Sequence, residues 1–123
     1  MDSKTRTYQF SLKIIEFINK LPKEMSTQII AKQLLRSATS IGANIIEAQA
    51  SPSRKDFTNF FHHSLKSANE TKYWLGLLRD SKKGDEETIN PLIQDVNEIA
   101  KILGSSLLTL KNGSKFWTLT LHF

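Results

Sequence analysis

The sequence has 123 residues, which is enough for one domain with a single core. It contains no cysteine, so disulfide bonds and thiolate chemistry are excluded. No apolar run approaches the roughly 18 to 20 residues that span a bilayer, and the first residues lack the apolar segment of a signal peptide. We therefore expect a cytoplasmic protein with no membrane partner.

Charge is unevenly distributed along the chain. The net charge is +5 overall. Residues 1–84 carry 14 Lys or Arg against 7 Asp or Glu, whereas residues 85–123 carry 3 against 5. A basic excess of this size attracts phosphates, although it is also ordinary for the solubility of a small domain. RNA or DNA is therefore one candidate partner.

A first helix is predicted over about residues 7–20, because apolar residues recur at helical spacing until Pro22. One stripe contains Phe10, Ile14, Phe17 and Leu21, and a second stripe beside it contains Tyr8, Leu12, Ile15 and Ile18.

A second helix is predicted over about residues 24–48, with two apolar seams. The first seam repeats every seven residues, through Leu34, Ala38, Ile41, Ile45 and Ala48. The second contains Leu35, Gly42 and Ile46. Residues 37–46 carry no charge, so either three other helices surround this segment or a second subunit covers it. We favour the second subunit, because a chain of this length has few residues with which to surround one helix. The second seam is therefore a predicted oligomer interface.

Polar residues of the same helix form a further line, for which the third helix offers partners. The predicted polar seam is Arg36, Ser40, Asn44, Glu47 and Glu70. Its expected role is structural, with an ion pair between Arg36 and Glu70 fixing the register of two helices. If the partner is buried, losing such a pair costs about 3–5 kcal/mol.

Two more helices complete the pattern. The third is predicted over about 54–81, after a capping motif at Ser53 and with Gly84 beyond its end; its inward residues are Phe57, Phe61, Ser64, Ala68, Thr71, Leu75 and Leu78. The fourth is predicted over about 89–111, with an N-cap at Thr88 or Asn90; its inward residues are Ile89, Ile93, Val96, Ala100, Leu103, Leu107 and Leu110. Four such helices predict an all-α, up-down-up-down four-helix bundle over residues 1–112.

The last residues, 113–123, form a separate tail. Apolar and polar residues alternate there, as in a strand, although the chain offers no strand to pair with. The tail is therefore predicted either to be disordered or to dock on a neighbouring chain.

Catalysis and metal binding have no support in the sequence. There is no Glu-x-x-His, no His-x-x-x-His, no glycine-rich phosphate loop and no Gly-x-Ser-x-Gly. We predict that the protein is not an enzyme and uses no metal or cofactor. For nucleic acid, the expected contacts are cations of the third helix: Arg54, Lys55, Lys66, Lys72 and Arg79.

Two segments together resemble a known family. "QLLRSATSIGANIIEA" (33–48) followed by "KDFTNFFHHSLKSANETKYWLGLL" (55–78) is similar to the four-helix-bundle proteins encoded in intervening sequences of 23S ribosomal RNA. Leu21-Pro22 after the first helix also fits the family pattern. Two departures are Ala48, where the family commonly has glycine, and the tail.

The resemblance implies a left-handed bundle that assembles into a ring, typically a homopentamer. It also implies kinship with the accessory protein of diversity-generating retroelements, a basic pentamer that binds nucleic acid and a reverse transcriptase. The expected function is a ring-forming, RNA-binding accessory protein. The alternative is a protein-interaction scaffold with no role in nucleic-acid binding.

Overall fold

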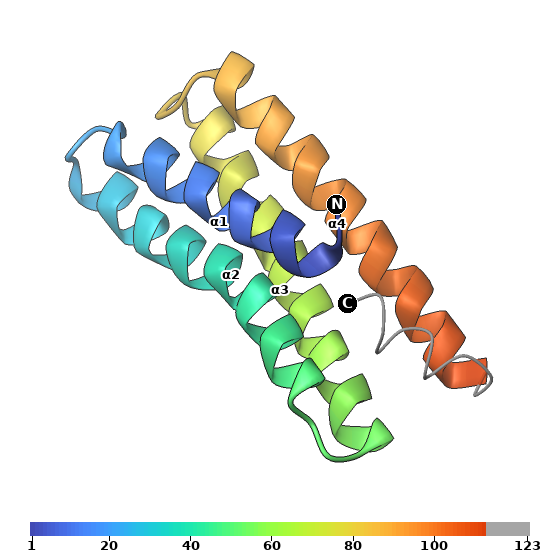
Figure 1. Ribbon diagram of the computed structural model, residues 1–123. Helices are drawn as coiled ribbons and strands as arrows, with labels where there is room; N and C mark the ends of the chain where they lie inside the picture. Colours follow the sequence, from blue (N-terminus) through green and yellow to red (C-terminus); the bar gives the residue numbers. More distant parts are fainter. Residues whose placement is uncertain (113–123) are drawn as a thin grey trace.

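The computed structural model describes residues 1–112, and these residues form four helices (Figure 1). They are α1 (Ser3–Asn19), α2 (Met25–Gln49), α3 (Arg54–Asp80) and α4 (Glu86–Asn112). Consecutive helices run antiparallel, and the main contacts join α1 to α2, α2 to α3, α3 to α4, and α4 back to α1. The predicted all-α four-helix bundle is therefore confirmed, whereas the tail prediction lies outside the described residues. Among residues 1–112, no helix combines the length and the apolar content needed to cross a membrane.

Local hydrogen bonds explain where α1 and α3 begin. The Asp2 carboxylate accepts a hydrogen bond from the Thr5 N–H at 2.7 Å, so α1 starts four residues earlier than predicted. This bond also lowers the pKa of Asp2 below its ordinary value. Ser53 caps α3 as predicted, accepting a hydrogen bond from the Asp56 N–H at 3.2 Å.

The predicted N-cap of α4 is wrong. The helix already begins at Glu86, and the Asp85 carbonyl accepts hydrogen bonds from the backbone N–H groups of Thr88 and Ile89. Pro91 therefore lies inside the helix, in its second turn rather than its first. The first helical turn tolerates proline best, but one backbone hydrogen bond lost near an end is compatible with a helix that packs along its whole length.

The inward sides of α2 and α3 agree with the predicted seams. All seven inward residues predicted for α3 are buried, as are the five of the first α2 seam. Two buried hydroxyls of α3 bond across to α2: Ser64 Oγ donates to the Ile41 carbonyl at 2.8 Å, and Thr71 Oγ1 donates to Ser37 Oγ at 2.9 Å. These bonds satisfy polar groups that would otherwise be costly inside the core.

The inward side of α4 is rotated from the prediction. Leu92, Ile99 and Ser106 are buried, whereas Ile93, Ala100 and Leu107 are only partly buried. The predicted and the observed inward residues share Ile89, Val96, Leu103 and Leu110 and differ by one position at the other three. Both sets have heptad spacing, so spacing alone does not choose between them. The choice follows from the positions of α3 and α1, the two helices that pack most closely against α4.

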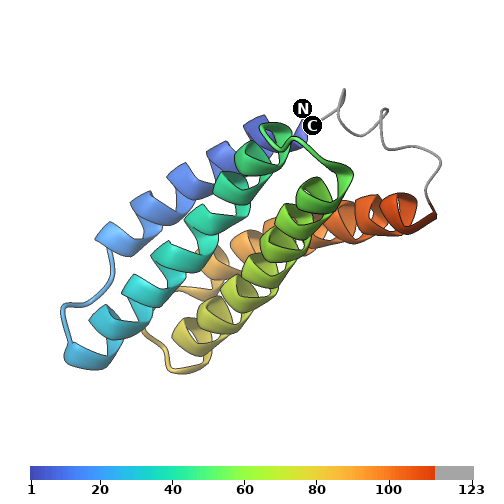
Figure 2. The same ribbon diagram turned by 90° about the horizontal axis from the view of Figure 1, so that it is seen from below.

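Helix α1 is shorter than its neighbours, at 17 residues against 27 in α4. These numbers correspond to about 25 Å and 40 Å of helix. Figures 1 and 2 show α4 extending well past the start of α1. Arg6 ties that start to the middle of α4 through ion pairs with Asp95, at 3.2 Å, and Glu98.

The link between α3 and α4 differs from the prediction. Lys82, rather than Gly84, adopts the left-handed backbone conformation that ends the helix, with φ of 61°. Gly84 is needed for another reason: a Cβ there would lie 2.9 Å from Ile89 Cδ1 and 3.1 Å from Phe17 Cζ. The link can therefore pass closely over the end of the core.

Candidate nucleic-acid interface

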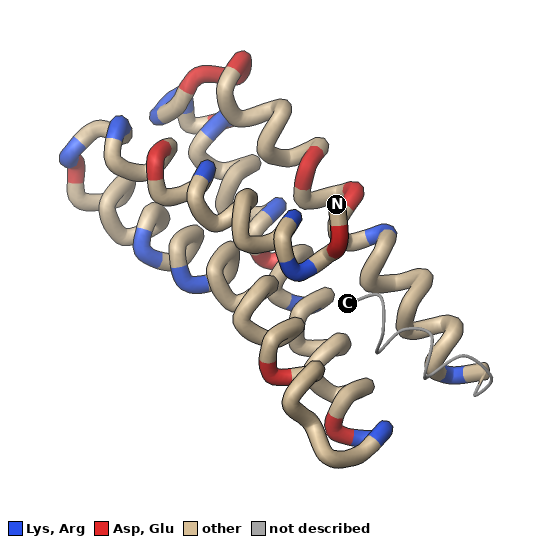
Figure 3. Tube along the Cα trace, in the orientation of Figure 1, with Lys and Arg blue, Asp and Glu red and all other residues tan. Residues whose placement is uncertain are grey.

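Charged residues of both signs are spread along the bundle rather than divided between two sides (Figure 3). The five cations predicted to contact nucleic acid all lie on α3, but they do not form one patch. Successive helical residues are separated by 100° around the axis. Lys55 and Lys66 consequently lie on the outward face, opposite the buried residues. Lys72 and Arg79 lie on the side toward α4, since Arg79 contacts Asn90 there.

The two arginines of this set make contacts within the chain. Arg54 donates a hydrogen bond to the carbonyl of Leu110 near the end of α4. Arg79 pairs with Asp80 at 3.0 Å and donates to Asn90 Oδ1 at 2.9 Å. Both guanidinium groups therefore have structural roles that compete with binding a phosphate.

The three lysines differ from the arginines. Lys55 and Lys66 are exposed and Lys72 is half-buried. None of the three forms an ion pair or side-chain hydrogen bond with another residue of the range 1–112. Their ammonium groups are thus available to phosphates without loss of an internal contact.

The predicted polar seam contains one link between helices. Arg36 of α2 pairs with Glu70 of α3, as expected. Ser40 and Asn44 instead donate to backbone carbonyls of their own helix, at 2.7 and 2.8 Å. Glu47 is exposed and, like the lysines, has no ion pair within the described chain.

The environment of the Arg36–Glu70 pair differs from that of a buried pair. The Arg36 side chain is 57% exposed and that of Glu70 is 31% exposed. Water therefore screens the pair, and the loss of 3–5 kcal/mol expected for a buried partner does not apply. The sequence also gave no indication that Trp74 takes part, although its Nε1 donates to Glu70 Oε2 at 2.9 Å.

The residues of the predicted oligomer interface have two different environments. Leu35 and Ile46 are exposed on α2, at 37% and 48%. Gly42 instead faces α1 of the same chain, where an added Cβ would lie 3.0 Å from Thr7 Oγ1. Sequence spacing grouped these three residues, but the structure places α1 over Gly42.

Helix α1 has an exposed apolar stripe of its own. Tyr8, Leu12 and Ile15 lie on one face at i, i+4 and i+7, and each is at least 42% exposed. This is the second stripe predicted for the first helix, of which Ile18 alone packs partly against the core. Exposed apolar residues that gather on one face are typical of a protein interface.

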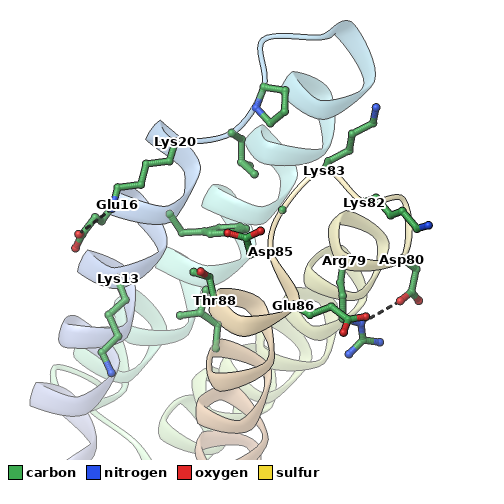
Figure 4. Close-up of a pocket in the computed structure, with 15 residues that line it drawn as sticks. Lys13, Glu16, Lys20, Arg79, Asp80, Lys82, Lys83, Asp85, Glu86 and Thr88 are labelled. Carbon is green, nitrogen blue, oxygen red and sulfur yellow. Dashed lines mark hydrogen bonds and ion pairs between the residues drawn. The ribbon is translucent and has the colours of Figure 1, made fainter.

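A cleft of about 940 Å³ lies at the end of the bundle that carries the α1–α2 and α3–α4 links (Figure 4). Charged residues line it, and most of them are paired: Lys20 with Glu16, Arg79 with Asp80, Lys83 with Glu24, and Lys13 with Asp95. Figure 4 shows the first two of these pairs, joined by dashed lines. The cleft therefore offers few charged groups to a ligand.

Metal-binding clusters are absent from the described part of the chain, where no three His, Asp or Glu side chains come together. The geometry defines a small four-helix-bundle protein with exposed apolar side chains on α1 and α2 and, on α3, lysines that are unpaired within residues 1–112. The chain matches the family described as "23S rRNA-intervening sequence protein" over residues 1–105. It belongs to this family.

A solved structure supports the same assignment. It is a protein of unknown function from the S23 ribosomal protein family of Bacteroides thetaiotaomicron, and it is 40% identical to this chain. The alignment covers 85% of this chain and 97% of that one, with a TM-score of 0.80. Among curated proteins, none matches the chain.

Proposed function

We propose that this protein is a non-catalytic accessory protein that binds RNA through α3 and assembles with copies of itself through α1 and α2. The observation that carries the RNA-binding part is the set of lysines at positions 55, 66 and 72, which have no carboxylate partner among residues 1–112. The excess of Lys and Arg over Asp and Glu in the first 84 residues also favours the binding of phosphates. Binding of this kind reads the phosphate backbone and tolerates many sequences.

Self-assembly is supported by the apolar face of α1 and α2. A second copy that covered this face would remove apolar surface from water, which is favourable. The side chains concerned are Tyr8, Leu12, Ile15 and Ile46. The family resemblance favours a ring of five copies. Assembly would also bring several lysine sets into one particle, so that weak sites act together.

RNA binding is tested by titrating a fluorescent RNA hairpin with the protein at several salt concentrations between 50 and 200 mM. We expect a steep loss of affinity with salt. The variant Lys55→Gln/Lys66→Gln/Lys72→Gln should bind at least tenfold more weakly. Its plot of log K against log salt should be flatter by about 2 to 3 for each subunit in contact, at about 0.7 to 0.9 per phosphate contact.

The matched control removes the same charge elsewhere. Lys23, Lys82 and Lys111 are exposed and have no ion pair among the described residues, so their conversion to glutamine should change affinity far less. Equal losses in both triple variants would show that only net charge matters. Failure of the wild-type protein to bind RNA at low salt would favour the scaffold function, for which the exposed apolar face is the supporting observation.

Assembly is tested by sedimentation equilibrium. We expect a particle several times the 14.0 kDa chain mass, with five copies as the expected number. Leu12→Glu/Ile46→Glu should dissociate it, because burying two charges at an interface is costly. Leu108→Glu, on an exposed apolar residue of α4, is the control. A wild-type monomer would contradict the proposal.

A further inference from the structure

One exposed aromatic side chain stands on the outward face of α3. Tyr73 is 61% exposed, and its ring meets that of Trp74 edge-on, with centroids 5.1 Å apart and planes at 73°. Trp74 is partly buried against the core. Tyr73 is therefore held from one side by a packed neighbour, while most of its own surface is in water.

Hydrogen bonds fix that neighbour and a second planar group beside it. Trp74 Nε1 donates to Glu70, and Glu70 pairs with Arg36 of α2. Arg36 also donates to Gln33 Oε1, from Nη2 at 3.1 Å and from Nε at 3.3 Å. The guanidinium is thus held across the α2–α3 seam although its side chain is 57% exposed. Side chains fixed before binding lose less conformational entropy when they bind.

A free cation lies on the same face as the tyrosine. Lys66 precedes Tyr73 by seven residues, which is two helical turns or about 10 Å along the axis. It is exposed and has no ion pair within residues 1–112. Glu70, which pairs with Arg36, follows Lys66 by four residues and precedes Tyr73 by three, so the Arg36 guanidinium lies at the edge of this face. Beside the Glu70 carboxylate, the face therefore combines an aromatic ring, a fixed guanidinium and an ammonium group, which are the groups that stack on bases and bind phosphates.

We propose that this face, made of Arg36, Lys66 and Tyr73, binds unpaired nucleotides of RNA, with a base stacked on Tyr73 and a phosphate near Lys66. The inference rests on the proposed RNA binding and makes it more specific. Bases inside an A-form duplex are stacked on each other and do not present a ring face to an aromatic side chain. Single-stranded loops and ends do, so the protein should prefer them to a continuous duplex.

The test compares one fluorescently labelled 12-nucleotide RNA of mixed sequence, free of internal pairing, with the same strand annealed to its complement. Wild-type protein should bind the single strand more tightly at the same salt concentration. Tyr73→Leu should weaken single-strand binding by about tenfold or more, because a stacked base contributes that much when an aromatic residue is removed. Tyr73→Phe should stay within about twofold, since the ring is kept.

The control is Leu108→Ala, which truncates an apolar side chain of similar exposure, 64%, on α4. It should leave single-strand binding nearly unchanged, once sedimentation shows which variants keep the wild-type assembly. Duplex binding should change little in the Tyr73 variants.

Four outcomes would overturn the inference, and they are distinguishable. If the wild type binds duplex as tightly as single strand, or if Tyr73→Leu binds single strand normally, the base-binding face fails while RNA binding through lysines stands. If Tyr73→Leu alters the oligomer, Tyr73 belongs to a protein interface. If the wild type binds neither RNA, the proposed function fails together with this inference.

Discussion

The two sides of helix α2 have nearly the same composition and opposite environments. Toward the core, Ala38, Ile41 and Ile45 are fully buried. On the outer side of the same uncharged segment, Ala43 is exposed and Ile46 is 48% exposed. The absence of charge therefore marks two different surfaces, one covered by the chain itself and one left open. The lesson is that an uncharged helix is not by itself a buried helix.

The inner side is also specified by polar groups. Ser64 and Thr71 reach α2 through short hydrogen bonds at positions where the heptad pattern shows only small residues. Small side chains let the helices approach closely, and hydroxyls satisfy each other or a carbonyl at that distance. On the outer side of residues 37–46, Thr39, Ser40 and Asn44 bond only to carbonyls of α2 itself, among the hydrogen bonds of the described chain.

The largest expected difference between the two sides comes from truncating one isoleucine on each. Ile41→Ala should lower the free energy of unfolding by about 2–5 kcal/mol, because it opens a cavity in a packed core. Ile46→Ala should cost less than about 1 kcal/mol in dilute protein, because that side chain is already half in water. Urea denaturation measures both.

Protein concentration sharpens this comparison. If Ile46 lies at an interface between copies, the cost of Ile46→Ala should grow with concentration, whereas that of Ile41→Ala should stay constant. Equal costs for the two variants at low concentration would contradict the assignment of inner and outer sides.

Gly42, at the boundary between the two sides, should give the next largest effect. Gly42→Leu forces a side chain against Thr7, which is itself buried and bonded to the Ser3 carbonyl at 2.8 Å. Overpacking of this kind costs about 1–3 kcal/mol. Thermal unfolding of the variant measures this loss of stability. An unchanged midpoint would show that α1 can shift away from the new side chain at little cost.

The control for this substitution has the opposite expected sign. A Cβ at Gly76, in α3, meets no atom within 4 Å. Gly76→Ala should therefore stabilise the protein by about 0.5–1 kcal/mol, because alanine restricts the unfolded chain and favours helix.

The smallest expected effect concerns the polar link between α2 and α3. A double-mutant cycle with Arg36→Ala and Glu70→Gln should give a coupling of about 0.2–1 kcal/mol, reduced by salt, because the pair is substantially exposed. A coupling of several kcal/mol would indicate that the pair is buried in the assembled protein, and would move the interface toward this seam.

The sequence by itself determined the number of helices and the inward sides of α2 and α3. On α3 one apolar stripe repeats with heptad spacing, and on α2 the seam of five residues is longer than the second seam of three, so burying the longer stripe sets the orientation of each helix. The capping serine of α3 could also be predicted from the sequence, because its hydrogen bond joins residues only three positions apart. The start of α1 had an equally local signal in Asp2, which the apolar pattern alone passed over.

Only the tertiary structure decided how α4 faces the core and which side chains meet across helices. Two overlapping stripes of α4 fit the same spacing, and the positions of α3 and α1 selected Leu92, Ile99 and Ser106. In the same way, sequence spacing places Gly42 on one seam with Leu35 and Ile46, whereas in the structure α1 covers the glycine. Helical periodicity fixes which residues share a face, whereas the partner of that face depends on where other helices lie.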